Sequence, residues 1–558
     1  MAVINGQWRQ RTTGGDNERL VASTSNAFRA RQMEAEKLVG VTTLEATRQW
    51  LCVREMEPRA RRLRSRGTVL CEEQCCARKK KYEQARRIVI NTPLHSSCTH
   101  PNTNQSQVHT HIYIHSTMVH PNSRTVGDTE HSWCRAVRGG TGIAVLALRT
   151  SKAPNISHLQ ASLRSLQTSH PILRSRLLHN NNNTFSFLTS PTSSCTLTSL
   201  TLPTNVSDPL TQILELELNR NTWHDSKDDH MFFATVYTLP NANTWVVTLR
   251  LHVSACDRTT ALLLLRELLT LMEGDHGAGQ DNSNHKEEPS LAIEDLVTRG
   301  KGKKPVWTRG LDMLAYSLNS LRLSNLKFVD AKNPRFSQVV RLQLNQNETK
   351  GVLAGCKLSG IKLCGALVAA GLMATHGSKM RSKKYGVVTL TDCRSSLESP
   401  LTDNFGFYHS AILNSHEMKG GETLWELAKR TYQTLAHSKN CDKHFSDMAD
   451  LNFLMCRAIE NPSLTPAASL RTSLMSVFED TVVDNGGAKQ REIGVEDYMG
   501  CASVHGVGPS IAIFDTIRDG SLDCVCVYPA PLHSRELMLE LVGKMKAFLV
   551  EAANGYTG

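Results

Sequence analysis

From about residue 118 onward, segments with the residue spacing of strands alternate with segments that have the spacing of helices. The apolar, β-branched run TGIAVLALRT at 141–150 predicts a strand. In 155–170, Leu159, Leu163 and Leu166 share one helical face, which predicts an amphipathic helix. Further strands are predicted at 230–239, 244–253, 336–345, 385–394 and 510–529, the last a hairpin turned at Asp519-Gly520. Further helices are predicted at 258–272, 348–360, 361–377, 423–438 and 534–553.

This alternation is typical of an α/β protein. A charged segment rich in Gly, Asn and Asp, 273–305, interrupts it and predicts a linker between two halves of similar element order. The expected domains are therefore 118–305 and 306–558. Two such halves favour a binding site at their interface.

The first 117 residues have weak hydrophobic periodicity apart from a candidate helix near 29–50. They carry net charge +9 of the total +12, and the runs RARRLRSRG and ARKKK lie within 59–81. Two interpretations stay open for this region: a disordered basic extension, or an upstream region that is not part of the native protein. A nucleic-acid arm is the weaker third interpretation, because the 441 residues of the body are nearly neutral.

Composition excludes several classes of protein. The sequence contains no run of 18 apolar residues, so a membrane span is not expected. The N-terminus lacks the apolar core of a signal peptide. Sixteen cysteines without such a signal predict free thiols in a reducing, cytoplasmic compartment. The spacing of the cluster Cys71, Cys75, Cys76, His95, Cys98 and His100 fits no paired zinc-site scheme, so no metal is expected.

Three segments resemble the CoA-dependent acyltransferase superfamily, which includes condensation domains and alcohol acetyltransferases. They are SHPILRSRL at 169–177, TLTDCRSSLESPL at 389–401 and DNFGFYHSAIL at 403–413. Their order and spacing carry more weight than any one of them, and the similarity extends over nearly four fifths of the chain. A wider similarity to uncharacterised plant condensation-like proteins is also expected. In SHPILRSRL, His170 and Arg174 are interpreted as fold-defining residues.

The resemblance implies two chloramphenicol-acetyltransferase-like halves with a tunnel at their interface. It implies transfer of an acyl group from CoA or a carrier thioester, as co-substrate, to a hydroxyl or amine, with no bound cofactor. The partners would be the small-molecule acyl donor and acceptor, and the protein would be a monomer. A relative that binds a ligand or partner in the tunnel without catalysis is the alternative.

In the superfamily's catalytic motif, His-x-x-x-Asp, the histidine is the base and lies four residues before the aspartate. Here His252 lies five residues before Asp257, so Val253 falls at the position of the base and Arg258 replaces the motif glycine. Two interpretations stay open. A shift of one residue along a strand moves a side chain to the opposite face. Either a one-residue bulge restores the direction of His252, so that it points into the tunnel, or His252 is a packed histidine and the base is missing.

The other motif positions have structural roles by resemblance. Asp257 is expected to form a salt bridge with Arg394 and also fits an N-cap. The tunnel-shaping candidates are Asn404, Phe405, Gly406 and His505. Cys256 is a further candidate for a nucleophile, but the sequence shows no partner that would stabilise its thiolate. His409 receives no role.

Overall fold

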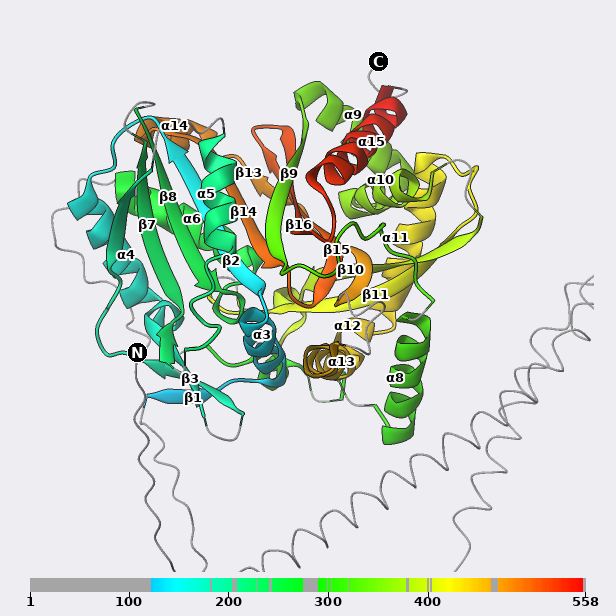
Figure 1. Cartoon of the computed structure of the whole chain (residues 1–558), viewed down its shortest axis with the longest axis horizontal. Helices are drawn as coiled ribbons and strands as arrows, with labels where there is room; N and C mark the ends of the chain where they lie inside the picture. The colour runs from blue at the N-terminus through cyan, green and yellow to red at the C-terminus, as the bar shows by residue number, and fades with distance from the viewer. Residues whose placement is uncertain are drawn as a thin grey trace, which may run out of the picture. The chain divides into compact units, whose positions relative to one another are not determined.

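The computed structural model describes residues 122–554 except 181–182, 203–207, 227, 240–242, 274–289, 299, 303, 321, 378–380, 399–400, 402–403 and 463–469. The expectations for 1–117, which include the helix near 29–50, the basic runs and the cysteine and histidine cluster, lie outside the described residues. The described residues belong to one compact unit. The expected α/β class is confirmed, with three sheets and helices packed on them (Figure 1).

A five-stranded sheet has the order β14-β2-β8-β7-β5. Its strands are β14 (Val495–Val504), β2 (Thr141–Thr150), β8 (Thr244–His252), β7 (Phe232–Leu239) and β5 (Leu197–Thr201). β2 is buried on both faces, in keeping with its continuous apolar run. β14 comes from the second half of the sequence and pairs antiparallel with β2, so this sheet contains strands from both halves.

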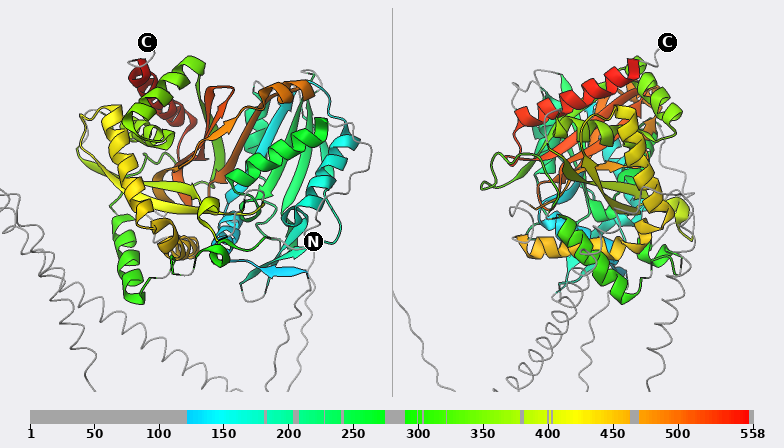
Figure 2. Two further views of the ribbon diagram at one scale, coloured as in Figure 1. Left: turned by 180° about the vertical axis from the view of Figure 1, so that it is seen from behind. Right: turned by 90° about the vertical axis from the view of Figure 1, so that its right-hand side faces the viewer.

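Helices cover both faces of this sheet. Leu146 and Leu148 of β2 pack in one core cluster with α4 (Ile156–Ser169) and α6 (Arg258–Glu273). Val145 and Ala147, on the opposite face, pack with α5 (Pro209–Leu218). Seen from behind, α4 and α6 lie side by side across the sheet (Figure 2). The second cluster also contains residues of the larger sheet, so one core joins the two sheets.

The larger sheet has the order β11-β10-β12-β15-β16-β9, and β13 pairs with β15. Its strands are β9 (Phe336–Leu344), β10 (Lys383–Asp392), β11 (His409–Met418), β12 (Arg471–Phe478), β13 (Val482–Asp484), β15 (Gly508–Arg518) and β16 (Ser521–Ala530). Its main core cluster is formed with α9 (Gln346–Ser359), α10 (Leu363–His376), α11 (Leu424–Asn440) and α15 (Arg535–Ala553). The predicted hairpin turn is confirmed, because Asp519 and Gly520 join β15 to β16 with positive φ angles of 46° and 80°.

A small sheet and several helices complete the described part of the chain. The small sheet has the order β1-β4-β3-β6, from Ser123–Thr125, Phe185–Thr189, Ser175–His179 and Asp228–His230. The remaining helices are α3 (Asp128–Arg138), α7 (Ile293–Leu296), α8 (Val306–Ser320), α12 (Lys443–Ser446), α13 (Met448–Glu460) and α14 (Gly487–Ile493). Short 3-10 turns are η2 (Pro171–Arg174), η4 (Val253–Ala255) and η5 (Arg394–Ser396). Among the described residues, no single helix has the length and hydropathy of a membrane span. Only α9 and α10, taken together, have that length and hydropathy, and the pair is bent by 104°.

Candidate active site

The end of β8 determines where His252 and Val253 point. β8 pairs residue by residue with β2 up to His252, which lies opposite Ile143, so the register continues without a bulge. The turn η4 follows directly. Leu251 of β8 and Val253 of η4 both line one cavity, and His252, which lies between them in the sequence, is not among the residues that line it.

His252 is fully buried in the interior of its own half. Its Nδ1 accepts a hydrogen bond from the Ser254 N–H at 3.2 Å and lies 2.7 Å from the Ser254 hydroxyl oxygen. The ring meets Trp223 edge-on at 5.2 Å between centroids. Burial lowers the pKa of His252 to about 3, and its Nε2 is buried with no hydrogen-bond partner among the described residues. This geometry favours the packed histidine over the catalytic base.

Asp257 and Arg394 are brought together across the two halves. Arg394 Nη1 lies 2.8 Å from Asp257 Oδ2, and Arg394 Nη2 donates to Oδ1 at 3.0 Å. The carboxylate also accepts from the Thr260 N–H at 2.8 Å, which caps α6, and from the Tyr408 N–H at 2.8 Å. Burial alone would raise the pKa of Asp257, but Arg394 and then His409 outweigh it and hold that pKa well below its usual range. Asp257 is therefore a fixed, buried negative charge.

The segment 404–406, in the loop before β11, supports this ion pair. The Gly406 carbonyl accepts from the Asp257 N–H at 3.1 Å, and a Cβ at Gly406 would lie 2.9 Å from the Tyr408 ring. Phe405 stacks on His170 with 3.6 Å between ring centroids, and His170 Nε2 lies 2.7 Å from Glu267. Asn404 and Phe405 border a small recess beside His170 and do not line the cavity that Leu251 and Val253 line. Their contacts are those of residues that fix the loop.

The cavity that Leu251 and Val253 line has a volume of about 170 Å³ and is lined by residues of both large sheets. The five-stranded sheet contributes apolar positions such as Val145 and Cys501, and the larger sheet contributes Leu390 and Phe514. The polar and charged side chains at the cavity are few: Asp257, Arg258, His409, Thr141, Ser476, Tyr498, Ser503 and Thr516. An apolar cavity with a few convergent polar groups is the usual form of a small-molecule site.

Arg258, His505 and Cys256 differ in their relation to this cavity. Arg258 lines it and is held by Asp515 at 3.1 Å, with its guanidinium 4.5 Å from the centre of the Phe478 ring. His505 lies outside the lining, near the Ser337 hydroxyl at 3.0 Å, and burial followed by nearby arginines lowers its pKa to about 4. Burial raises the pKa of the Cys256 thiol, which disfavours a nucleophilic thiolate although Cys256 lines the cavity.

His409, at the first position of β11, was given no role from the sequence. It is only 5% exposed, it lines the cavity, and its Nδ1 lies 3.1 Å from Asp257 Oδ2. The distance is that of an ion pair, but the angles fall outside those of a hydrogen bond. The available sequence signal was a titratable residue within 403–413, one of the three segments that carry the resemblance.

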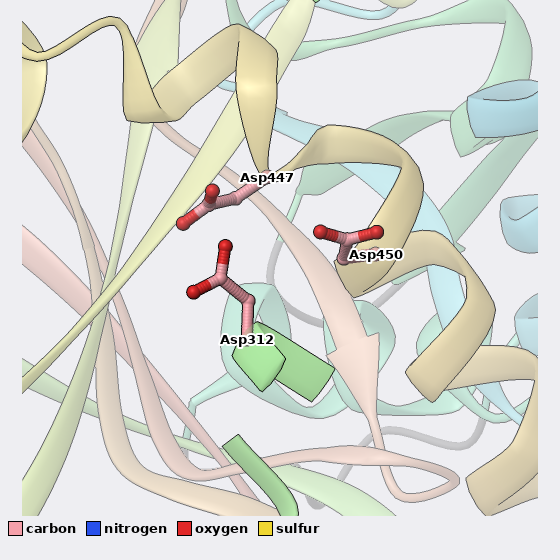
Figure 3. A group of neighbouring side chains, drawn as sticks. All are labelled: Asp312, Asp447 and Asp450. Carbon is pink, nitrogen blue, oxygen red and sulfur yellow. The ribbon is translucent and has the colours of Figure 1, made fainter. Parts of the chain in front are cut away.

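A separate acidic cluster joins α8 to the α12–α13 corner. The carboxylates of Asp312, Asp447 and Asp450 converge there (Figure 3). The Lys304 ammonium already contacts all three, at 2.7 Å from Asp312 and 3.3 Å from Asp450, and the Tyr316 hydroxyl donates to Asp447. The Lys304 ammonium therefore provides the positive charge at this position, and the cluster connects α8 to the α12–α13 corner.

The fold is similar to those of condensation-domain and acyltransferase proteins. No protein-family model matches the sequence, and no curated protein sequence matches it significantly. A trichothecene 15-O-acetyltransferase from Fusarium sporotrichioides has 13% identity and a TM-score of 0.60, with 76% of this chain and 95% of that chain covered. The EpoB cyclization-docking bidomain from Sorangium cellulosum has 13% identity and a TM-score of 0.56, with 77% and 85% covered. The X-domain from teicoplanin biosynthesis has 16% identity and a TM-score of 0.53, with 78% and 96% covered.

Identities this low show a shared fold alone. The expectation of two acetyltransferase-like halves is confirmed at that level. The geometry adds that the buried ion pair and the cavity lie where the two large sheets meet.

Proposed function

We propose that this protein transfers an acyl group from CoA or a carrier thioester to a hydroxyl or amine acceptor. The observation that carries the proposal is the apolar cavity lined by both large sheets, with the Asp257–Arg394 pair at its side. An acyl chain matches an apolar lining, and the few polar groups would orient the reacting atoms. The fixed pair would hold the η4–α6 loop, and with it one wall of the cavity, in a single geometry.

Two further observations support this proposal. One structural neighbour is named as an acetyltransferase, with 95% of its chain covered by the similarity. The second is the position of Asp257, which caps α6 directly after the strand that borders the cavity. Under this proposal the acyl donor is a co-substrate and no cofactor is bound.

The second candidate function is ligand binding without catalysis. Val253 favours it, because Val253 lines the cavity at the motif position of the base and cannot take a proton. Such a protein would hold an acyl thioester or a similar apolar ligand and release it unchanged.

The full chain incubated with a panel of acyl-CoA donors and hydroxyl or amine acceptors tests the two functions. Free CoA and acylated product are quantified by chromatography with mass detection, since the exposed Cys441 would interfere with a thiol reagent. Turnover with any pair supports transfer. Thermal stabilisation by acyl-CoA without turnover supports binding alone, and neither effect across the panel refutes both functions.

We further infer that the protein acts as a monomer in a reducing, cytoplasmic compartment. The cysteines in the described part of the chain are free thiols, which is in keeping with such a compartment. Sedimentation at several concentrations tests the monomer, and imaging of the tagged full chain tests the compartment. Closest kinship with plant condensation-like proteins likewise stays a prediction.

A further inference from the structure

The cavity contains an imidazole that is not the histidine of the sequence motif. Among the described residues, His409 is the only histidine that lines the cavity. It enters from β11 of the larger sheet, whereas the motif position, Val253, enters from the η4 turn after β8. The site therefore has an imidazole on the wall formed by the other half.

The orientation of His409 suits a base. Its Nδ1 is buried and lies 3.1 Å from Asp257 Oδ2, so Nε2 is the ring nitrogen left for a ligand in the cavity. Phe478 and Phe407 flank the ring, with centroids at 5.8 and 6.2 Å, and limit its rotation. Catalytic hydrogen bonds are often poorly aligned without substrate and tighten when it binds, so a small rotation would complete the bond between Nδ1 and Asp257.

We propose that His409 is the general base of the acyl transfer, with Asp257 as the residue that positions it. This inference rests on the proposed function. A carboxylate that accepts from Nδ1–H selects the tautomer with an unprotonated Nε2 and stabilises the imidazolium that forms. Asp257 is suited to that task because it is buried, charged and held by Arg394.

The step balances without an added reagent. Nε2 of His409 takes the proton from the acceptor hydroxyl or amine as its oxygen or nitrogen attacks the thioester carbonyl carbon. The tetrahedral intermediate collapses, the C–S bond breaks, and the imidazolium returns the proton to the departing sulfur. The products are an ester or amide and a free thiol, and His409 is neutral again.

The charged groups near His409 form salt bridges with other charged side chains. Asp257 and Arg258 come from the start of α6, and Asp392 and Arg394 come from the end of β10 and η5. Arg258 is paired with Asp515, and Arg394 contacts both Asp257 and Asp392. Of these groups only Asp257 is within ion-pair distance of His409 among the described contacts.

The test compares His409→Gln with His416→Gln in the full chain. His416 is a buried histidine of the same strand and lies outside the cavity, so it is a matched control. We expect kcat to fall about 100- to 10,000-fold in His409→Gln, with acyl-CoA affinity and unfolding temperature within the range of the control. Turnover within threefold of wild type in a folded His409→Gln protein would overturn the assignment and leave the proposed function standing. No turnover by the wild type on any donor would refute both.

A pH profile and chemical rescue cover the case in which His409→Gln does not fold. For the wild type, kcat/KM should fall as the pH is lowered, because a base that has taken up a proton cannot accept another from the substrate. His409→Ala should regain activity when free imidazole is added, and His416→Ala should not respond. A flat profile together with no rescue would overturn the proposal.

Discussion

Replacing Asp257 with asparagine would leave a buried guanidinium without its counter-charge. The side chains of Asp257 and Arg394 are 1% and 8% exposed, and the carboxylate also accepts two backbone N–H groups, of Thr260 and Tyr408. The Asn amide keeps one acceptor and turns an NH₂ toward groups that donate. Breaking a buried pair from one side costs about 3–5 kcal/mol, and we expect Asp257→Asn to lose about that much free energy of unfolding.

Urea denaturation at pH 7 measures this loss, with Glu540→Gln as the control. Glu540 pairs with Lys544 at 2.6 Å on the surface, where the side chains are 62% and 53% exposed, so its loss should stay within about 0.5 kcal/mol. A loss below about 1 kcal/mol in Asp257→Asn would refute the reasoning and show that Asp392, 3.2 Å from Arg394, compensates the charge.

The same variant has a pH signature. The folded-state pKa of Asp257 is depressed, so its contribution is present above the unfolded value near 3.9 and is lost as pH falls through the folded value. The difference in stability between wild type and Asp257→Asn should therefore shrink as pH falls from the unfolded value of this carboxyl toward its folded value.

Three further predictions concern neighbouring positions. His252 has a folded pKa near 3 against 6.5 unfolded, so it should cost the wild type up to about 1.4 kcal/mol of stability per pH unit as pH falls from 6.5 to 3. His252→Gln should lack that slope in urea titrations and retain turnover; a loss of turnover in the folded variant would return the base to His252. Phe405→Ala should lose about 3–5 kcal/mol in urea titrations, because it removes a 3%-exposed ring stacked on His170; a loss under 1 kcal/mol would contradict this. Val253→Phe should weaken acyl-CoA binding by at least about tenfold in calorimetry at a stability cost of about 1–3 kcal/mol; unchanged affinity would place the ligand elsewhere.

The sequence predicted the elements well and the assignment of faces less well. The strand at 141–150 and the helix that Asp257 caps agree with the structure, because a local apolar period and an N-cap are visible in single segments. The helices α5 and α13 were not predicted, and neither was β14. The pairing of β14 with β2 depends on contacts between distant segments, which no local pattern contains.

The candidate site shows the same division. Strand alternation left His252 or Val253 facing the cavity. In the structure β8 keeps its register with β2 up to His252, and Val253, in the η4 turn that follows, is the one that lines the cavity. His409 was not predicted, because a histidine at a strand start can point either into a cavity or into a core. Its nearness to Asp257 depends on how the two sheets meet, which the residues around either position do not encode.

The pairing of β14 with β2 also bears on how the protein can be made. During synthesis, the edge of β2 stays open until Val495–Val504 have left the ribosome, and an open apolar edge readily pairs with another chain. Residues 118–305 produced alone would keep that edge exposed permanently. If the two halves were produced as separate fragments, they would therefore assemble only when β14 of the second fragment pairs with β2 of the first.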